Sequence, residues 1–188
     1  MKVVIIGGVA GGATAAARIR RLDEKAEIIV FEKSGYVSYA NCGLPYYIGG
    51  VIQNKEELTL QTPESFWKRF QITMKVRHEV TGIFPERKTV AVKNLNTGES
   101  FEEVYDKLLI STGAKPVWPK LPGTDLDNLF TLRTVEDTLK IREFVEKSAK
   151  VGSACRRRIY WPGACGKSSG AGTGRYHSSE TKAAYESS

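Results

Sequence analysis

The sequence predicts an α/β fold in which a parallel sheet is covered by helices and carries a small antiparallel appendage. The first observation is a short apolar run over residues 2–6, followed at once by glycines and by a segment rich in Ala and Arg. The second is a group of three alternating segments between residues 78 and 104, separated by turn residues. The third is a change of composition after Lys150, where the apolar periodicity ends. We therefore expect a folded N-terminal part followed by a disordered tail.

Composition excludes several classes of protein. With 188 residues, 41% of them hydrophobic and 26% charged, the chain is long enough for one domain with a core, or for one domain and part of another. The net charge is +7, but residues 151–188 hold six Lys or Arg and two Asp or Glu, so +4 belongs to them and +3 to the rest. That remainder predicts an ordinary solvated surface and no nucleic-acid partner.

Location and metal binding are also predicted from composition. No apolar run of about 18 residues occurs, so we expect no membrane span. The chain enters a strand directly, without a signal-peptide pattern. Its cysteines, Cys42, Cys155 and Cys165, match neither a disulfide framework nor zinc-ligand spacing. We expect a cytoplasmic protein with one special thiol and no metal site.

The first forty residues form the pattern of a dinucleotide-binding unit. Residues 2–6 predict a buried strand, residues 13–22 a helix, and residues 26–31 a second strand that ends on Glu32. The glycine-rich turn between the first strand and the helix is Gly7-Gly8-Val9-Ala10-Gly11-Gly12. Strand, turn, helix, strand and acid in register predict a Rossmann-like fold.

Each part of this unit has a physical role. Gly7 permits a tight turn, and Gly12 lets the helix pack closely on the strand. The helix N-terminus offers N–H groups and partial positive charge to a pyrophosphate. Glu32, twenty residues after Gly12, is placed to accept hydrogen bonds from a ribose. Val9 stands where the pattern has its middle glycine, and the pattern leaves FAD and NAD(P) as open alternatives.

Cys42 is the candidate reactive residue. Asn41 is a good helix N-cap, which would place Cys42 in the first turn of a short helix, where the helix dipole favours a thiolate. The alternative is a buried, inert cysteine, but Gly43 and Pro45 favour a shaped turn. Because no Cys-x-x-Cys partner is present, a redox-active Cys42 would pair with a small-molecule thiol or pass through a sulfenic acid.

The middle of the chain predicts scaffold. Three segments alternate and are separated by turns such as 96–99, which predicts an antiparallel three-strand appendage over 78–84, 89–94 and 100–104. His78 is interpreted as structural. A helix beginning at Pro63 is expected to pack through Phe66, Trp67 and Phe70.

Five motifs together are typical of one family. They are residues 5–12, 31–33, 38–47 around Cys42, 108–114, and 131–133 before an acidic helix over 135–147. On these motifs, residues 1–150 resemble the flavin-dependent pyridine nucleotide-disulfide oxidoreductases. The match is to the coenzyme A-disulfide reductases and their NADH oxidase and persulfide reductase relatives, which commonly have valine at the position of Val9.

The resemblance implies cofactors and site residues. FAD would lie along the glycine turn with Cys42 against its ring as the single redox-active cysteine, and NAD(P)H would reduce the intact enzyme, which is expected to be a homodimer. The implied cofactor-binding residues are Gly7, Gly8, Val9, Ala10, Gly11, Gly12, Glu32, Lys33, Val80, Thr112, Gly113 and Ala114. The implied coenzyme A-binding residues are Thr14, Arg18, Arg21, Ser38 and Asn41. From the residues alone, Arg18 and Arg21 favour a solvated helix surface over a ligand site. Phe70 stands where the family often has lysine.

The tail departs from this pattern. Residues 151–188 read literally as a basic, disordered segment, whereas the family predicts a second glycine-rich turn. Read one base along, Trp161 followed by Pro162 gives GGC, a glycine codon. Residues 155–168 then become compatible with Val-Val-Gly-Gly-Phe-Ile-Gly-Leu-Glu-Leu-Ala-Glu-Asn-Leu. We therefore expect a frameshift near residues 151–155.

The expected domains and function follow. Residues 1–118 would form an incomplete FAD-binding domain, 119–150 a connector and helix leading to a missing NAD(P)H domain, and 151–188 an out-of-frame tail. The first hypothesis is the N-terminal part of an enzyme reducing coenzyme A disulfide or a related disulfide or persulfide. The alternatives are an NADH oxidase cycling through a sulfenic acid, and a catalytically inactive FAD-binding fragment.

Overall fold

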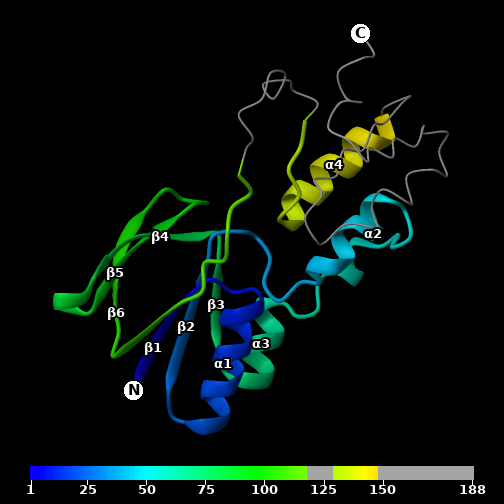
Figure 1. The fold of residues 1–188 in the computed structure, drawn as a ribbon. Helices are drawn as coiled ribbons and strands as arrows, with labels where there is room; N and C mark the ends of the chain where they lie inside the picture. Colours follow the sequence, from blue (N-terminus) through cyan, green and yellow to red (C-terminus); the bar gives the residue numbers. More distant parts are fainter. Residues whose placement is uncertain (118–128, 148–188) are drawn as a thin grey trace.

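The computed structural model describes residues 1–117 and 129–147, and its centre is a four-stranded parallel sheet (Figure 1). The strand order is β3-β2-β1-β7, with β1 at Lys2–Ile6, β2 at Glu27–Glu32, β3 at Thr73–Val76 and β7 at Lys107–Ile110. A second, antiparallel sheet has the order β4-β5-β6, formed by His78–Phe84, Thr89–Asn94 and Ser100–Val104. The predicted Rossmann-like fold with an antiparallel three-strand appendage is confirmed.

The remaining elements connect these sheets. The long helices are α1 (Ala10–Leu22), α3 (Pro63–Phe70) and α4 (Val135–Lys147). Shorter ones are the 3-10 turn η1 (Asn41–Gly43), α2 (Leu44–Ile48), and the 3-10 turns η2 (Lys55–Leu58) and η3 (Pro85–Arg87). No helix of the described part of the chain is long and apolar enough to cross a membrane.

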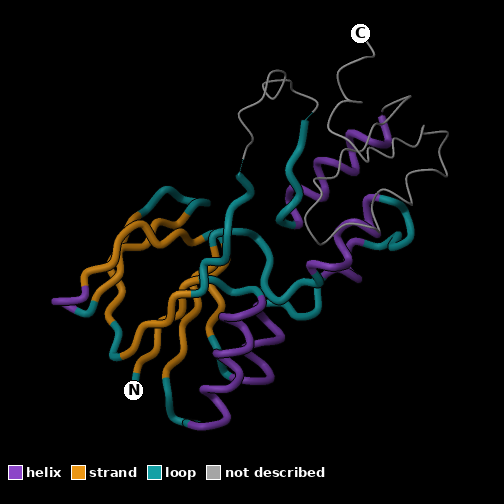
Figure 2. The backbone as a smooth tube through the Cα atoms, viewed as in Figure 1, coloured by secondary structure: helices purple, strands orange, loops and turns teal. Residues whose placement is uncertain are grey.

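The parallel strands are apolar on both faces because both faces are covered. In β1, Val3 and Ile5 point to one layer, where α1 and α3 pack through Ala13, Ala16 and Phe66. The other layer is the antiparallel sheet, so β1 and β2 are the middle of three layers (Figure 2).

Alternate residues of the same strands build the second half of the core. Val4, Ile6 and Phe31 pack against Val90 and Val92 of β5. Because successive side chains of a strand point to opposite faces, the unbroken apolar run of β1 fills both cores at once. His78 lies here in aromatic contact, 6.2 Å from the Phe31 ring, consistent with the structural role expected for it.

A third cluster lies beyond the carboxyl ends of the strands. Val135 of α4 packs with Leu44 of α2, Leu58 and Tyr39, and α2 and α4 lie side by side (Figure 1). This cluster attaches α4 to the segment that carries Cys42, so the described part of the connector packs on the folded N-terminal part.

Three details of the prediction are wrong or shifted. α1 begins at Ala10 rather than Ala13, because close packing holds the glycines in helical geometry despite their low propensity. The second strand is shifted by one residue, to Glu27–Glu32. Trp67 was expected on the packing face of α3, yet its side chain is 52% exposed while Phe66 is buried, because adjacent positions on a helix diverge by about 100°.

The expected domain boundary at residue 118 lies outside the described residues. So do two parts of the expected connector, residues 119–128 and 148–150, whereas its residues 129–147 are described. The expected tail over 151–188 lies wholly outside the described residues.

Candidate active site

The glycine turn at the carboxyl end of β1 leaves no room for side chains at two positions. Gly7 has a φ of +101°, and a β-carbon on it would lie 2.2 Å from the carbonyl oxygen of Ser111. A β-carbon on Gly12 would lie 1.7 Å from the carbonyl oxygen of Gly7. Backbone atoms cannot yield as a flexible side chain can, so both positions require glycine.

The N-terminus of α1 is open to an anion. Val9 occupies the N-cap position, where no side chain accepts from the first turn, and that turn holds no acidic residue. Ala10 and Gly11 are exposed. Free N–H groups and the positive end of the helix dipole therefore face the outside of the turn, which suits a pyrophosphate.

Glu32, the last residue of β2, is fixed beside this turn. Its Oε2 accepts from the N–H of Gly8 at 2.7 Å, and its Oε1 accepts from the N–H of Ser34 at 2.8 Å. The carboxylate is thereby oriented by two backbone donors, and its remaining lone pairs can accept from ribose hydroxyls.

The segment that follows β7 lies against the first turn. The N–H of Ser111 donates to the carbonyl of Ile6 at 2.8 Å, and Gly113 has a φ of +68°. The predicted residues Thr112, Gly113 and Ala114 are all exposed. The structure therefore brings the two glycine-containing segments together at one edge of the sheet, where dinucleotides bind in such folds.

Cys42 is exposed, in the 3-10 turn η1 that precedes α2. The expected N-cap at Asn41 is wrong: Ala40 occupies the cap position, and no side chain caps η1. The Asn41 Oδ1 instead accepts from Nη1 of Arg133 at 3.2 Å. The alternative of a buried cysteine is also wrong for Cys42, whereas Cys155 and Cys165 lie outside the described residues.

The predicted coenzyme A residues fall into two groups. Ser38 lies at the glycine turn, where its N–H donates to the Gly8 carbonyl at 3.1 Å, and Asn41 lies three residues further on, in η1. Thr14, Arg18 and Arg21 are exposed on α1, and their spacing of four and three residues places them on one helix face. That face runs about 10 Å along the helix, at a rise of about 1.5 Å per residue.

Two predicted cofactor residues sit on the other side of β2. Lys33 forms an ion pair with Glu79 of β4 at 2.7 Å, and Val80 is half-buried against the core between the sheets. Lys33 directly follows Glu32, and Val80 belongs to β4 of the antiparallel sheet, so neither residue is part of the glycine turn.

Arg133 is a residue to which sequence reasoning gave no role. Its Nε donates to the carbonyl of Ala114 at 3.2 Å while Nη1 donates to Asn41. The Thr131-Leu132-Arg133 motif could have singled out Arg133 in the sequence. It could not have indicated the partners of Arg133, which are far away in sequence. Burial raises the pKa of the nearby Tyr39 hydroxyl, and the charge of Arg133 partly opposes this rise.

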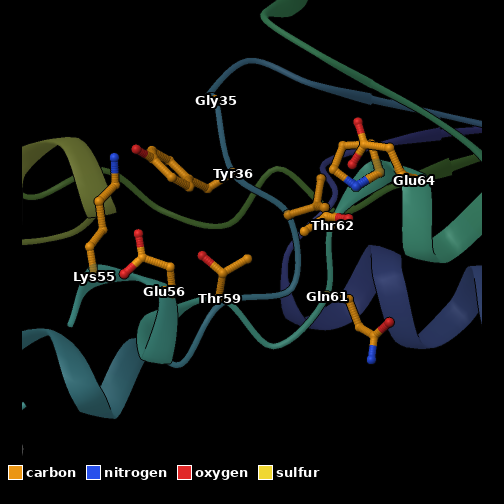
Figure 3. Close-up of a pocket in the computed structure, with 10 residues that line it drawn as sticks. Gly35, Tyr36, Lys55, Glu56, Thr59, Gln61, Thr62 and Glu64 are labelled. Atoms are coloured by element: carbon orange, nitrogen blue, oxygen red, sulfur yellow. The ribbon is translucent and has the colours of Figure 1, made fainter.

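A cavity of about 360 Å³ lies beside the segment that leads to Ser38 (Figure 3). None of its lining residues is a predicted site residue; they are Gly35, Tyr36, Val37, Lys55, Glu56, Thr59, Gln61, Thr62, Pro63 and Glu64. The Lys55 ammonium lies 5.2 Å from the centre of the Tyr36 ring at one end.

The described residues hold no group of three His, Cys, Asp or Glu side chains that could bind a metal.

Comparison with known proteins gives a family match. The family model described as pyridine nucleotide-disulphide oxidoreductase matches residues 1–153. A coenzyme A disulfide reductase of Staphylococcus aureus (strain bovine RF122 / ET3-1) is 50% identical over 145 residues, which are 77% of this chain and 32% of the relative. The chain thus spans about a third of the length of this curated relative.

Solved structures agree. The reduced CoADR-RHD of Bacillus anthracis has a TM-score of 0.76 and 50% identity, covering 78% of this chain and 26% of that one. A NAD-dependent persulfide reductase from A. fulgidus has a TM-score of 0.73 and 38% identity over 78% and 28%. The water-forming NADH oxidase from Lactobacillus brevis has a TM-score of 0.73 and 30% identity over 78% and 32%.

Proposed function

Because the chain belongs to the pyridine nucleotide-disulphide oxidoreductase family, we propose that it provides the FAD site and the reactive thiol of an enzyme that reduces coenzyme A disulfide. The cofactors of this family are FAD and NAD(P)H. The observation that carries the proposal is the exposed Cys42 in the turn between the glycine-rich site and α2.

The residues present fit FAD. The turn excludes β-carbons at Gly7 and Gly12, the N-terminus of α1 is uncapped, and Glu32 is oriented beside it. We assign the pyrophosphate to the N–H groups of the first turn of α1 and the adenosine ribose to Glu32. When bound, FAD supplies two-electron transfer between NAD(P)H and a sulfur.

Cys42 would carry the substrate chemistry. Its thiolate attacks one sulfur of the disulfide, a new S–S bond forms between them, and the other sulfur leaves as a thiolate with the electron pair of the broken bond. NAD(P)H then supplies the two electrons that reduce the mixed disulfide to the Cys42 thiolate and a second small thiol. No second cysteine lies in the described ranges to resolve this bond, so the partner thiol comes from the substrate.

The basic face of α1 supports coenzyme A as that substrate. Arg18 and Arg21 are exposed on the same face as Thr14, and guanidinium groups suit phosphates. The ends of α1 and α3 are joined, because Arg20 Nε donates to the carbonyl of Phe70 at 2.8 Å. The last turn of α3 adds two further basic residues, Lys68 and Arg69. Basic side chains therefore gather at this end of the two helices, beside the acidic residues Asp23 and Glu24 that follow α1.

A second candidate is an NADH oxidase, favoured by the match to the Lactobacillus brevis oxidase and by the same exposed Cys42. In that reaction two electrons from NADH would reduce oxygen to hydrogen peroxide. The Cys42 thiolate would attack one peroxide oxygen to give the sulfenic acid, and the other oxygen would leave as hydroxide, which takes up a proton to form water. Two electrons from a second NADH would then reduce the sulfenic acid to the Cys42 thiolate and water.

We also propose that the coding sequence continues in the neighbouring frame after about residue 151, and that the 188-residue chain alone turns over no NAD(P)H. Sequencing the DNA through this region tests the first part. The activity test measures NAD(P)H oxidation by the frame-restored protein, first with coenzyme A disulfide without oxygen, then with oxygen alone.

Disulfide-dependent oxidation supports the reductase. Oxidation with oxygen alone assigns the oxidase instead, and turnover by the 188-residue chain contradicts its proposed inactivity.

A further inference from the structure

We propose that Arg133 is a positioning residue that fixes the Asn41 amide as a hydrogen-bond donor to the sulfur leaving during thiol–disulfide exchange at Cys42. This inference rests on the proposed function, because it assigns a role within the same site. The inference concerns the orientation of the Asn41 side-chain amide, that is, which of Oδ1 and Nδ2 faces Arg133 and which one is left for the substrate.

The guanidinium of Arg133 joins two segments of the site. Nη1 lies 3.2 Å from Asn41 Oδ1, across 92 positions of sequence, and Nε lies 3.2 Å from the carbonyl oxygen of Ala114. Asn41 directly precedes Cys42 in η1, and Ala114 lies in the segment after β7. One planar group therefore spans from the reactive turn to the second glycine-containing segment.

Hydrogen-bond chemistry then determines the orientation of the amide. A guanidinium carries five donors and no acceptor, so only the oxygen of Asn41 can face it. With Oδ1 occupied, both hydrogens of Nδ2 are left to donate elsewhere. Among the described residues, Nδ2 has no acceptor, and both Asn41 and Cys42 are exposed.

Arg133 is itself held in place. Asp137 Oδ2 accepts from the N–H of Arg133 at 3.1 Å and from that of Thr134 at 2.9 Å. Thr134 Oγ1 in turn accepts from the N–H of Asp137 at 3.2 Å and so caps α4. The nearby Val135 is fully buried against Leu44 of α2. The guanidinium therefore extends from a fixed backbone, so little conformational freedom is lost when it orients Asn41.

The consequence for exchange is electrostatic. When the Cys42 thiolate forms its bond to one substrate sulfur, the other sulfur departs with the electron pair and a negative charge. An N–H of Asn41 beside that sulfur stabilises the charge as it develops, and a pre-oriented donor needs no reorganisation at that moment.

The test uses the full 188-residue chain loaded with FAD, with Cys155 and Cys165 changed to Ser so that Cys42 is its one thiol. Mass spectrometry follows the rate of mixed-disulfide formation with two probes, coenzyme A disulfide and bis(2-hydroxyethyl) disulfide. The variants are Arg133→Met, Arg133→Lys, Asn41→Leu and the double variant Arg133→Met/Asn41→Leu. FAD affinity and thermal unfolding of each variant verify its fold.

Arg133→Met and Asn41→Leu are each expected to slow exchange about fivefold, as for the loss of one hydrogen bond. The double variant is expected to be no slower than Asn41→Leu, since the two residues act as one unit. Arg133→Lys keeps a donor and restores most of the rate. Alkylation of Cys42 by iodoacetamide serves as the control reaction, because its leaving group, iodide, accepts hydrogen bonds only weakly. The rate of alkylation should change less than about twofold in Arg133→Met.

Two results would overturn the inference. One is that Arg133→Met slows disulfide exchange by the same factor in the Asn41→Leu background as in the chain with Asn41. Arg133 would then act through a residue other than Asn41. The other is equal slowing of exchange and alkylation, which would indicate a general structural role.

The two probes separate this inference from the proposed function. Reaction with bis(2-hydroxyethyl) disulfide but not with coenzyme A disulfide would contradict the proposed substrate, while the coupling between Arg133 and Asn41 would still be measured. A Cys42 that reacts with neither disulfide would contradict both proposals.

Discussion

A β-carbon on Gly12 would lie 1.7 Å from the carbonyl oxygen of Gly7. The first turn of α1 therefore packs directly on the end of β1, with no side chain between them. This contact sets the open N-terminus of the helix where a pyrophosphate can reach it. It also makes Gly12 a position at which the fold and the proposed cofactor site can be tested together.

Gly12→Ala is expected to lower the free energy of unfolding by about 3 kcal/mol or more, because the clash is with backbone. Gly11→Ala is the matched control, since its β-carbon would meet the Ser111 hydroxyl at 2.5 Å, a group that can rotate away. Urea unfolding of the two variants measures the difference. Equal destabilisation would show that the Gly12–Gly7 contact is not the cause.

Glu32→Gln is expected to cost about 1–3 kcal/mol of stability, because one of the two backbone N–H groups that the carboxylate accepts would face an amide N–H instead. The affected donors are those of Gly8 and Ser34. The control is Glu79→Gln, which removes an exposed ion pair with Lys33 and should change stability by less than about 1 kcal/mol. Similar losses in both variants would contradict the role given to Glu32.

Phe66→Ala and Trp67→Ala test the corrected face of α3. Phe66 is 3% exposed and packs on the parallel sheet, so its truncation should cost about 3–5 kcal/mol. Trp67 is 52% exposed, so its truncation removes less buried area and should cost about 1–2 kcal/mol. Thermal unfolding of both variants measures the two losses of stability. If Trp67 shared the packing face, as predicted from sequence, the two losses would be alike.

The pattern of local elements was predictable, but long-range contacts of polar side chains were not. The βαβ unit, its glycine turn and the antiparallel strands follow from apolar runs and turn residues, which are local signals. Asn41 was misassigned because an asparagine at a helix start ordinarily caps it. Its actual partner, Arg133, is 92 positions away, and nothing local in the sequence indicates that pair.

The packing face of α3 was predictable from local spacing. Phe66 and Phe70 are four positions apart and share the face that packs on the core, whereas Trp67 lies about 100° away from Phe66 around the helix. The start of α1 was placed late because glycines argue against a helix by propensity, whereas tertiary packing admits them.

Because of Tyr39, the free energy of unfolding is expected to fall at alkaline pH. Burial raises the pKa of its hydroxyl in the folded state, so the neutral form is favoured by folding. The resulting stability is complete below the pKa of the unfolded chain, about 10, and is lost as pH rises through the higher pKa of the folded state. Urea unfolding between about pH 8 and 11 should show a steeper decline for the unsubstituted chain than for Tyr39→Phe. Parallel curves would contradict burial as the cause.

The role of Cys42 as the reactive thiol is tested by locating the cysteine that reacts with coenzyme A disulfide. The 188-residue chain, loaded with FAD, is incubated with this disulfide and its peptides are mapped by mass, with Cys42→Ser as control. We expect a mixed disulfide on Cys42 that forms faster than any at Cys155 or Cys165, and that is absent at this position in the variant. Equal labelling of all three cysteines, or none at Cys42, would contradict its role as the reactive thiol.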